Sequence, residues 1–285
     1  MFKRLGLLVL IVALVAAVFT GCGGQDTTDE EQPETVEVDE LQDGKYLVKM
    51  PVSEQGNYPM AQMEVEDGEI VSFKYAEILV DSGEEKSEDN YEYQDGLDVI
   101  ANLNEQFNEK KDLNEVDFDA VSGATFTKGE FKKAVNELLV MASKGETYEP
   151  VYLDGEYEAK AEEPSNDWLA EVVVIVREGQ IVGIDYSEVA VKDMDSSKVV
   201  FDDDNKPVMG ADDKPKTEPV KVKKGDKKSI ENYAHLDAFD VIKGVQKQVI
   251  DNNGVEDLNL DGITGATGTR ETMLDLIAKA LEEAK

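Results

Sequence analysis

Two short segments of the sequence combine small residues with hydroxyl side chains in a way that suits the binding of an anion. They are 119–127 (DAVSGATFT) and 261–269 (DGITGATGT), and each comes just before an amphipathic helical pattern. Small residues let another molecule approach the backbone closely, and the start of a helix offers unpaired N–H groups and the positive end of its dipole. A threonine hydroxyl there can cap the helix or carry a phosphoester. The residues therefore predict an anion site that occurs twice.

Helix capping is the alternative explanation for both segments. Thr127 and Glu130 have the spacing of a capping box, so we assign the cap of the first helix to Thr127 rather than to Thr125. In the second segment Thr272 stands where the glutamate would be, which predicts a weaker cap at Thr269.

The elements that carry these segments occur twice along the chain. The residues around Asp43 and Asp67 recur 111 positions later, whereas those around Lys86, Asp98 and Ser122 recur 142 positions later. Collinear matches at two constant offsets indicate a duplication whose second copy has 142 − 111 = 31 extra residues between 187 and 227. We therefore expect two related domains: a first half, 43–149, and a second half, 150–285, with an insertion at about 190–225.

Each half is predicted to be α+β, a small antiparallel sheet packed with helices. The first half has a strand at 45–50 and a hairpin from 61–66 to 70–76 that turns at Asp67-Gly68. The second half has the corresponding hairpin from 168–176 to 181–187. Helices are expected near 97–108 and 239–249, followed by a terminal helix in each half. The insertion, rich in Lys, Asp and Pro, is predicted to be a solvated loop, with a lysine-rich docking site at 221–228 as the alternative.

The terminal helices show the clearest periodicity, with apolar residues at i, i+3, i+4, i+7 and i+8. We interpret these stripes as core rather than as cofactor contacts; they are Phe131, Ala134, Val135, Leu138 and Leu139 in the first half and Met273, Leu276, Ile277, Ala280 and Leu281 in the second.

Composition excludes several classes of function. The chain has 63 acidic and 29 basic residues, for a formal net charge of −34, which argues against binding nucleic acid. It has one cysteine and one histidine, which excludes a disulfide framework and multi-cysteine or histidine-cluster metal sites, and disfavours a Ser-His-Asp triad. Redox or group-transfer chemistry would therefore depend on a bound cofactor.

The N-terminus explains the single cysteine. Residues 1–21 have a charged start at Lys3-Arg4, an apolar run from Leu5 to Phe19 and a small residue before Cys22, the pattern of an export signal. Gly21-Cys22 resembles a bacterial lipobox, although Phe19 stands where leucine is usual, and it predicts lipid attachment at Cys22. The alternatives are an ordinary secretory signal and an uncleaved anchor. Residues 23–42 contain eight acids and no base, so 22–42 are expected to form an acidic, flexible tether.

These segments resemble the FMN-binding domain of the C and G subunits of sodium-pumping and Rnf-type NADH:quinone and ferredoxin oxidoreductases. The whole chain, signal included, resembles the tandem-domain flavoprotein lipoproteins of Gram-positive extracellular electron transfer, the pheromone-lipoprotein family. The pattern of that family is Asp-x-x-Ser/Thr-Gly-Ala-Thr/Ser, and both segments match it.

The resemblance implies two covalent FMN groups. In that family a secreted FAD-dependent flavin transferase attaches FMN through its phosphate to the hydroxyl after Gly-Ala, here Thr125 and Thr267. Gly123, Ala124, Gly265 and Ala266 would allow close approach, Ser122 and Thr264 would bond the phosphate, and Asp119 and Asp261 would begin the segment that the transferase reads or serve only as turn residues.

Six further residues are retained in both halves and are weaker candidates for flavin contacts: Lys86, Asn90, Tyr91, Lys228, Asn232 and Tyr233. A lysine beside the isoalloxazine would stabilise the reduced, anionic flavin, and a tyrosine would stack on it. The alternative is that these residues only start a helix. His235 is expected at the surface, and Trp168 in the core of a strand rather than against a flavin.

The implied function is electron transfer rather than an enzymatic reaction on a substrate of the protein's own. A lipid-anchored carrier on the outer face of the bacterial cytoplasmic membrane would take electrons from the membrane quinone/NADH dehydrogenase system. It would pass them to extracellular acceptors such as ferric iron. Two alternatives stay open: a non-redox surface binding lipoprotein, and a signal peptide whose residues 14–21 are released as a pheromone.

Overall fold

A computed structural model of the chain describes residues 40–285. The predicted signal, the lipid site at Cys22 and most of the acidic tether lie outside the described residues. The first half contains β1 (Gly44–Lys49), β2 (Asn57–Glu66), β3 (Glu69–Leu79), α1 (Gln94–Lys110), the short 3-10 helix η1 (Leu113–Glu115) and α2 (Thr125–Lys144). The second half contains β4 (Gly155–Lys160), β5 (Trp168–Arg177), β6 (Gln180–Ala190), β7 (Met194–Val199), β8 (Thr217–Val222), α3 (Asp237–Asn252) and α4 (Thr267–Glu282).

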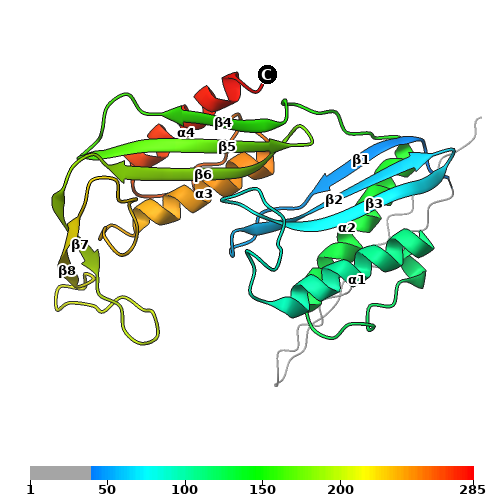
Figure 1. Ribbon diagram of the computed structural model, residues 1–285, viewed down its shortest axis with the longest axis horizontal. Coiled ribbons are helices and arrows are strands. Elements are labelled where there is room, and N and C mark those ends of the chain that lie inside the picture. The colour runs from blue at the N-terminus through cyan, green and yellow to red at the C-terminus, as the bar shows by residue number, and fades with distance from the viewer. Residues whose placement is uncertain (1–39) are drawn as a thin grey trace, which may run out of the picture. The chain divides into compact units, whose positions relative to one another are not determined.

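The predicted α+β class is confirmed. The strands of the first half pair antiparallel in the order β1-β2-β3, and those of the second half in the order β4-β5-β6. Within each half two helices pack against the sheet: α2 against β1 and β2 with α1 against β3, and α4 against β4 and β5 with α3 against β6 (Figure 1).

The central hairpin of each half turns where the sequence predicted. Asp67 and Gly68 have φ of 53° and 76°, and Glu178 and Gly179 have φ of 52° and 65°. Two successive left-handed residues form the hairpin turn whose twist matches the flanking strands. The turn therefore fixes the register that places Glu77 and Glu188 near the ends of β3 and β6.

Each sheet buries the helix stripes that the periodicity predicted. All ten apolar residues assigned to the terminal helices are buried. In the first half Phe131 of α2 packs edge-on against Phe73 and Phe107, with ring centroids 5.5 and 6.2 Å away. In α1 and α3 the buried stripe includes Val99 and Val241, whereas the apolar Phe239 and Ile242 of α3 are only half-buried.

The predicted cap at Thr127 is wrong, as is the weaker one at Thr269. The terminal helices begin two residues earlier, at Thr125 and Thr267, directly after Ala124 and Ala266. The residues before these starts adopt left-handed backbone conformations, which turn the chain sharply into the helix. Thr127 consequently lies in the first helical turn, where its buried hydroxyl donates to Glu77 instead of capping.

The insertion is an antiparallel hairpin, which corrects the prediction of a solvated loop. Met194 pairs with Val222 and Val199 with Thr217, so β7 and β8 form a two-stranded sheet of their own. Val199 and Val222 are buried although most of the insertion is polar. The lysine-rich run is also not uniformly solvated, because the side chain of Lys228 at its end is only 7% exposed.

Residues of both halves meet in one hydrophobic cluster. Leu47, Tyr58 and Ile78 of the first half belong to the same cluster as β5, β6, α3 and α4. The Tyr58 hydroxyl donates to the Val182 carbonyl at 2.8 Å.

Among residues 40–285 no helix has the length and apolar character needed to cross a membrane.

Candidate functional site

The Gly-Ala-Thr segments form the same sharp turn in both halves. Gly123 and Ala124 have φ of 85° and 44°, and Gly265 and Ala266 have φ of 86° and 29°. A left-handed alanine is strained, and each segment therefore stores a distorted backbone next to a helix start. Distortion of this kind is concentrated at functional sites, which singles out the residue that follows the turn.

Thr125 and Thr267 are the first residues of α2 and α4, and both are exposed. In the described chain neither helix has a side chain that caps its N-terminus. The first N–H groups and the positive end of the helix dipole therefore lie beside an accessible hydroxyl, an arrangement that suits a phosphate.

A basic residue in the first turn of each helix holds the segment in place. The Lys128 ammonium donates to the Val121 carbonyl at 2.6 Å, and the Arg270 guanidinium donates to the Ile263 carbonyl at 3.0 Å. Both bonds bridge seven residues across the turn. The two basic side chains also add positive charge near each helix N-terminus. The sequence patterns did not single out Lys128 or Arg270.

An aspartate lies against each turn from the preceding helix. Asp237, the first residue of α3, accepts a hydrogen bond from the Ala266 N–H at 3.2 Å. A Cβ added at Gly265 would lie 2.9 Å from the Asp237 carboxylate, so glycine is needed for this close approach. In the first half, a Cβ added at Gly123 would lie 3.8 Å from the Asp95 side chain. The shared offset of 142 could have identified this pair.

The other motif residues lie at the surface, on the turn before each helix. Asp119, Ser122, Asp261 and Thr264 are exposed, with both aspartates in turns. No side-chain hydrogen bond of Ser122 or Thr264 is present in the part of the chain that the structure describes, so both hydroxyls remain available to a ligand.

A buried polar cluster lies behind the turn in the first half. The Lys86 ammonium is 2.6 Å from the Glu77 carboxylate, and the two side chains are 5% and 4% exposed. Thr127 donates to the other oxygen of Glu77 at 2.7 Å. A buried ion pair needs such additional hydrogen bonds, because desolvation of both charges is expensive.

The second half repeats this cluster with Glu188, Lys228 and Thr269. Lys228 pairs with Glu188, and the side chains are 7% and 10% exposed. Thr269 donates to Glu188 at 3.5 Å, a longer bond than its counterpart. Both glutamates escaped the sequence analysis, and both threonines entered it only as predicted helix caps, although the two repeat offsets relate each pair.

A tyrosine covers each buried lysine. The Lys86 ammonium lies 4.1 Å from the centre of the Tyr91 ring, and that of Lys228 lies 4.3 Å from Tyr233. Burial, together with the charges of Glu188 and Asp237, raises the pKa of Tyr233. Tyr233 is therefore a neutral hydrogen-bond donor at physiological pH.

Asn90 and Asn232 have a structural role that the sequence left open. Asn90 accepts from the Ser87 N–H at 2.8 Å and donates to the Glu85 carbonyl at 3.0 Å. Asn232 accepts from the Ser229 N–H and donates to the Lys227 carbonyl in the same way. These bonds close the loop that carries lysine and tyrosine. The loop precedes α1 or α3, so the Lys-Ser pair does not start a helix.

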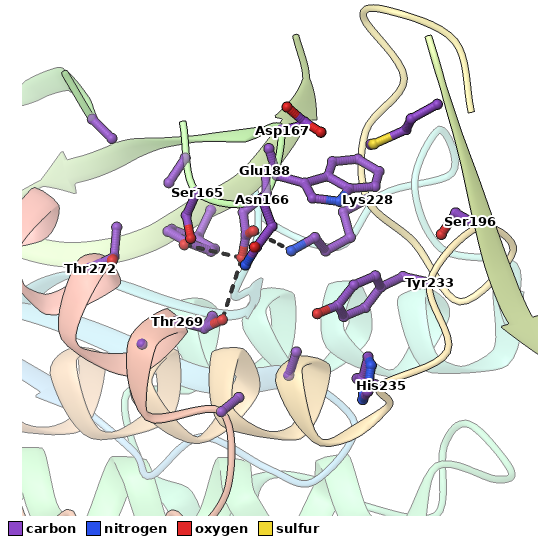
Figure 2. Close-up of a pocket in the computed structure, with 18 of the residues that line it drawn as sticks. Ser165, Asn166, Asp167, Glu188, Ser196, Lys228, Tyr233, His235, Thr269 and Thr272 are labelled. Atoms are coloured by element: carbon purple, nitrogen blue, oxygen red, sulfur yellow. Dashed lines mark hydrogen bonds and ion pairs between the residues drawn. The ribbon is translucent and has the colours of Figure 1, made fainter. Parts of the chain in front are cut away.

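A cavity of about 740 Å³ opens beside the second Gly-Ala-Thr segment. Ala266, Gly268 and Thr269 line it from the start of α4, and Lys228, Glu188 and Tyr233 line it from the buried cluster. Figure 2 shows Thr269, Lys228, Glu188 and Tyr233 around the cavity, with Ser196 of the insertion and His235 on the same side as Tyr233. Volumes of 300–1,000 Å³ are typical of sites for small molecules and cofactors.

Trp168 also lines this cavity, which changes the expectation that it serves only as strand core. It is 4% exposed, and the Lys228 ammonium lies 5.1 Å from its ring. His235 is exposed as expected, but it too lines the cavity, 5.2 Å from the Tyr233 ring. The cavity thus has aromatic walls and one buried lysine, which is paired with Glu188, beside the start of α4. Its other charged lining residues are acidic: Glu163, Asp167, Asp195 and Asp237.

The surroundings fit FMN. A phosphate would be held at the helix start, and the cavity beside it offers aromatic faces and a buried cation for a planar ring. The first half provides the same helix start and the same Lys-Glu-Thr cluster, with Phe126 exposed directly after Thr125 and Tyr93 exposed beside Tyr91.

Comparison with known proteins supports a flavin. Residues 60–140 match the FMN-binding domain family, and this match points to a flavin-binding protein. A crystal structure of the protein CPE2226 from Clostridium perfringens is similar to part of the chain. The two are 26% identical, with 38% of this chain and 93% of that chain covered and a TM-score of 0.34. No curated protein matches the sequence.

Proposed function

We propose that the protein is a lipid-anchored electron carrier with FMN esterified to Thr125 and Thr267. The observation that carries the proposal is the exposed threonine at an uncapped helix start, beside a cavity lined by aromatic side chains and the buried Lys228. The same helix start and buried ion pair occur in the first half, within the segment that matches the FMN-binding domain.

Attachment requires only the threonine hydroxyl and a donor of the FMN group. The threonine oxygen forms a bond to the FMN phosphorus of FAD, the pyrophosphate bond breaks, AMP leaves and the hydroxyl proton is released. A secreted flavin transferase would carry out this step. The exposure of both hydroxyls supports access by such an enzyme.

When bound, FMN supplies reversible electron transfer through its ring. The residues of this chain position it: Lys128 and Arg270 fix the turn, and the helix start neutralises the phosphate. Each buried lysine is paired with a glutamate, so the cluster offers one ammonium group without adding net charge. Covalent attachment prevents loss of the cofactor by dilution outside the cell.

The location and the redox partners belong to the same proposal. A diacylglycerol group on Cys22 would hold the chain on the outer face of the cytoplasmic membrane, and the acidic residues 23–42 would extend from it. Electrons would come from the membrane quinone/NADH dehydrogenase system and leave to extracellular acceptors. The net charge of −34 favours cationic acceptors such as ferric iron, since a negative surface raises their local concentration.

Substitution of both threonines tests the proposal. Protein produced together with the transferase is expected to keep its flavin fluorescence through denaturing electrophoresis. Thr125→Val with Thr267→Val is expected to abolish this fluorescence and to leave the circular dichroism spectrum unchanged. Fluorescence that survives in the double variant would contradict the assignment, and absence of flavin from the wild type would favour a non-redox binding lipoprotein.

A further inference from the structure

The cavity beside the second Gly-Ala-Thr segment has a wall for which the first half has no equivalent. Met194, Asp195 and Ser196 of β7 line the cavity, and all three belong to the insertion. In the first half the chain runs from Leu79 to Lys86 through a short loop, whereas the corresponding path from Ala190 to Lys228 contains the β7–β8 hairpin.

The hairpin is fixed to the loop that carries the site residues. Ser196 donates to the Asn232 carbonyl at 2.7 Å, and Lys198 pairs with Glu231 at 2.9 Å. These two partners immediately precede Tyr233 in the sequence. Movement of β7 would therefore disturb the position of Tyr233 over Lys228.

The hairpin also covers the aromatic side of the cavity. Met194 and Val222 pack with Trp168 and Ala190 in a small hydrophobic cluster, and Val222 is 1% exposed. The position equivalent to Trp168 in the first half is Asn57, by the offset of 111. In the first half Tyr93 and Phe126 are 63% and 61% exposed, whereas their equivalents by the offset of 142 are His235 and Gly268.

We propose that the β7–β8 hairpin makes the second site an enclosed one, so that small molecules in solution reach its cofactor less easily than the cofactor of the open first site. This inference rests on the proposed function, because it concerns FMN on Thr267 and Thr125. Exchange of electrons with soluble acceptors then occurs mainly at the first site.

Quenching of flavin fluorescence by acrylamide measures this difference. Acrylamide is neutral, so the negative charge of the chain does not bias its approach. Thr267→Val leaves FMN at the first site only, and Thr125→Val leaves it at the second only. Because cavities of this class bury roughly 70–90% of a ligand's surface, we expect a bimolecular quenching constant about threefold lower for Thr125→Val.

Intact mass separates failure of the inference from failure of the proposed function. Each single variant should carry one FMN, and a variant without it contradicts the attachment itself. Equal quenching constants in two correctly loaded variants would overturn the inference while leaving the attachment intact.

Removal of the hairpin in the Thr125→Val background tests its role. Excision of residues 193–223 gives the second half the loop length of the first, and it is expected to raise the quenching constant to that of the first site. Met194→Ala with Ser196→Ala shortens two side chains of the wall and keeps both strands. This double variant should also raise the quenching constant, and it serves as the test if the excised protein does not fold. An unchanged constant in this double variant would contradict the proposal.

The outer part of the hairpin provides the matched control. Val200 donates to the Lys216 carbonyl at 2.9 Å, so residues 201–215 can be replaced by Asn-Gly, a two-residue turn. This variant keeps β7 and β8 and the wall of the cavity. Its quenching constant should equal that of the parent, and an increase would mean that the outer loop rather than the wall shields the site.

Discussion

The Lys86 ammonium lies 2.6 Å from the Glu77 carboxylate with both side chains buried, directly behind the turn that precedes Thr125. Lys228 and Glu188 repeat this pair behind Thr267. The pair links the strand, the loop and, through Thr127, the helix start. Its geometry therefore bears on both the stability of the fold and the electrostatics of the site.

Breaking the buried pair is expected to destabilise the protein strongly. Lys86→Met leaves the Glu77 carboxylate buried without its counter-ion, which should reduce the free energy of unfolding by about 3–5 kcal/mol. Urea denaturation measures the change. Lys74→Met is the control, because Lys74 pairs with Glu85 in an exposed position, where loss of an ion pair costs below about 1 kcal/mol. Similar losses in the two variants would contradict this account.

Neutralising Glu188 is expected to make the second flavin easier to reduce. Glu188→Gln in the Thr125→Val background leaves the charge of Lys228 uncompensated, which favours the reduced, anionic cofactor. We expect a rise in midpoint potential of roughly 30 mV, equivalent to 1.4 kcal/mol for two electrons, measured by spectroelectrochemistry. Glu163→Gln at the exposed rim should change the potential less, because solvent screens it. A fall in potential on Glu188→Gln would contradict the assigned role of Lys228.

Lys49 is expected to make stability rise with pH in the alkaline range. Burial lowers its pKa to about 8, and the nearby Asp251 limits the fall. Since the unfolded chain binds more protons at this residue between pH 8 and its ordinary pKa of 10.5, stability increases across that window, by at most about 3 kcal/mol.

Lys49→Met tests this pH dependence. Removing the amine should make the free energy of unfolding rise less with pH between 8 and 10 than it does in the wild type. Lys45→Met, whose side chain is 68% exposed, is the control and should keep the wild-type slope. Equal slopes of the free energy of unfolding against pH in Lys49→Met and the wild type would contradict the lowered pKa of Lys49.

Gly183 is expected to tolerate no side chain. A Cβ at this position would lie 2.4 Å from the backbone nitrogen of Gly83 in the first half. Gly183→Ala should therefore destabilise the protein by about 1–3 kcal/mol through overpacking. Gly129→Ala provides the contrast, because a Cβ there meets nothing within 4 Å inside α2, so it should stabilise by about 0.5–1 kcal/mol. Thermal unfolding of both variants measures these changes. An unchanged stability in Gly183→Ala would contradict the close packing.

The sequence predicted the regular elements well because local patterns determine them. Asp67-Gly68 fixed the hairpin through its turn geometry, and the spacing of Phe131, Ala134 and Leu138 fixed the buried face of α2. Hairpin turns and helix faces depend on neighbouring residues, which a single sequence contains.

Long-range contacts explain what the sequence did not predict. The cap at Thr127 failed because the carboxylate that binds its hydroxyl, Glu77, is 50 residues away. The hairpin of the insertion was missed because its strands are largely polar and lack the alternation of a half-buried sheet. Glu77 and Glu188 looked like ordinary strand residues, although their relation by the offset of 111 was visible.

The most direct test of the central claim is the intact mass of the mature protein isolated from its native membrane. The account predicts a lipid-modified chain that begins at Cys22 and carries two FMN groups, with one lost in each of Thr125→Val and Thr267→Val. A lipid-modified chain of unmodified mass at both threonines, isolated from cells that contain the transferase, would contradict it.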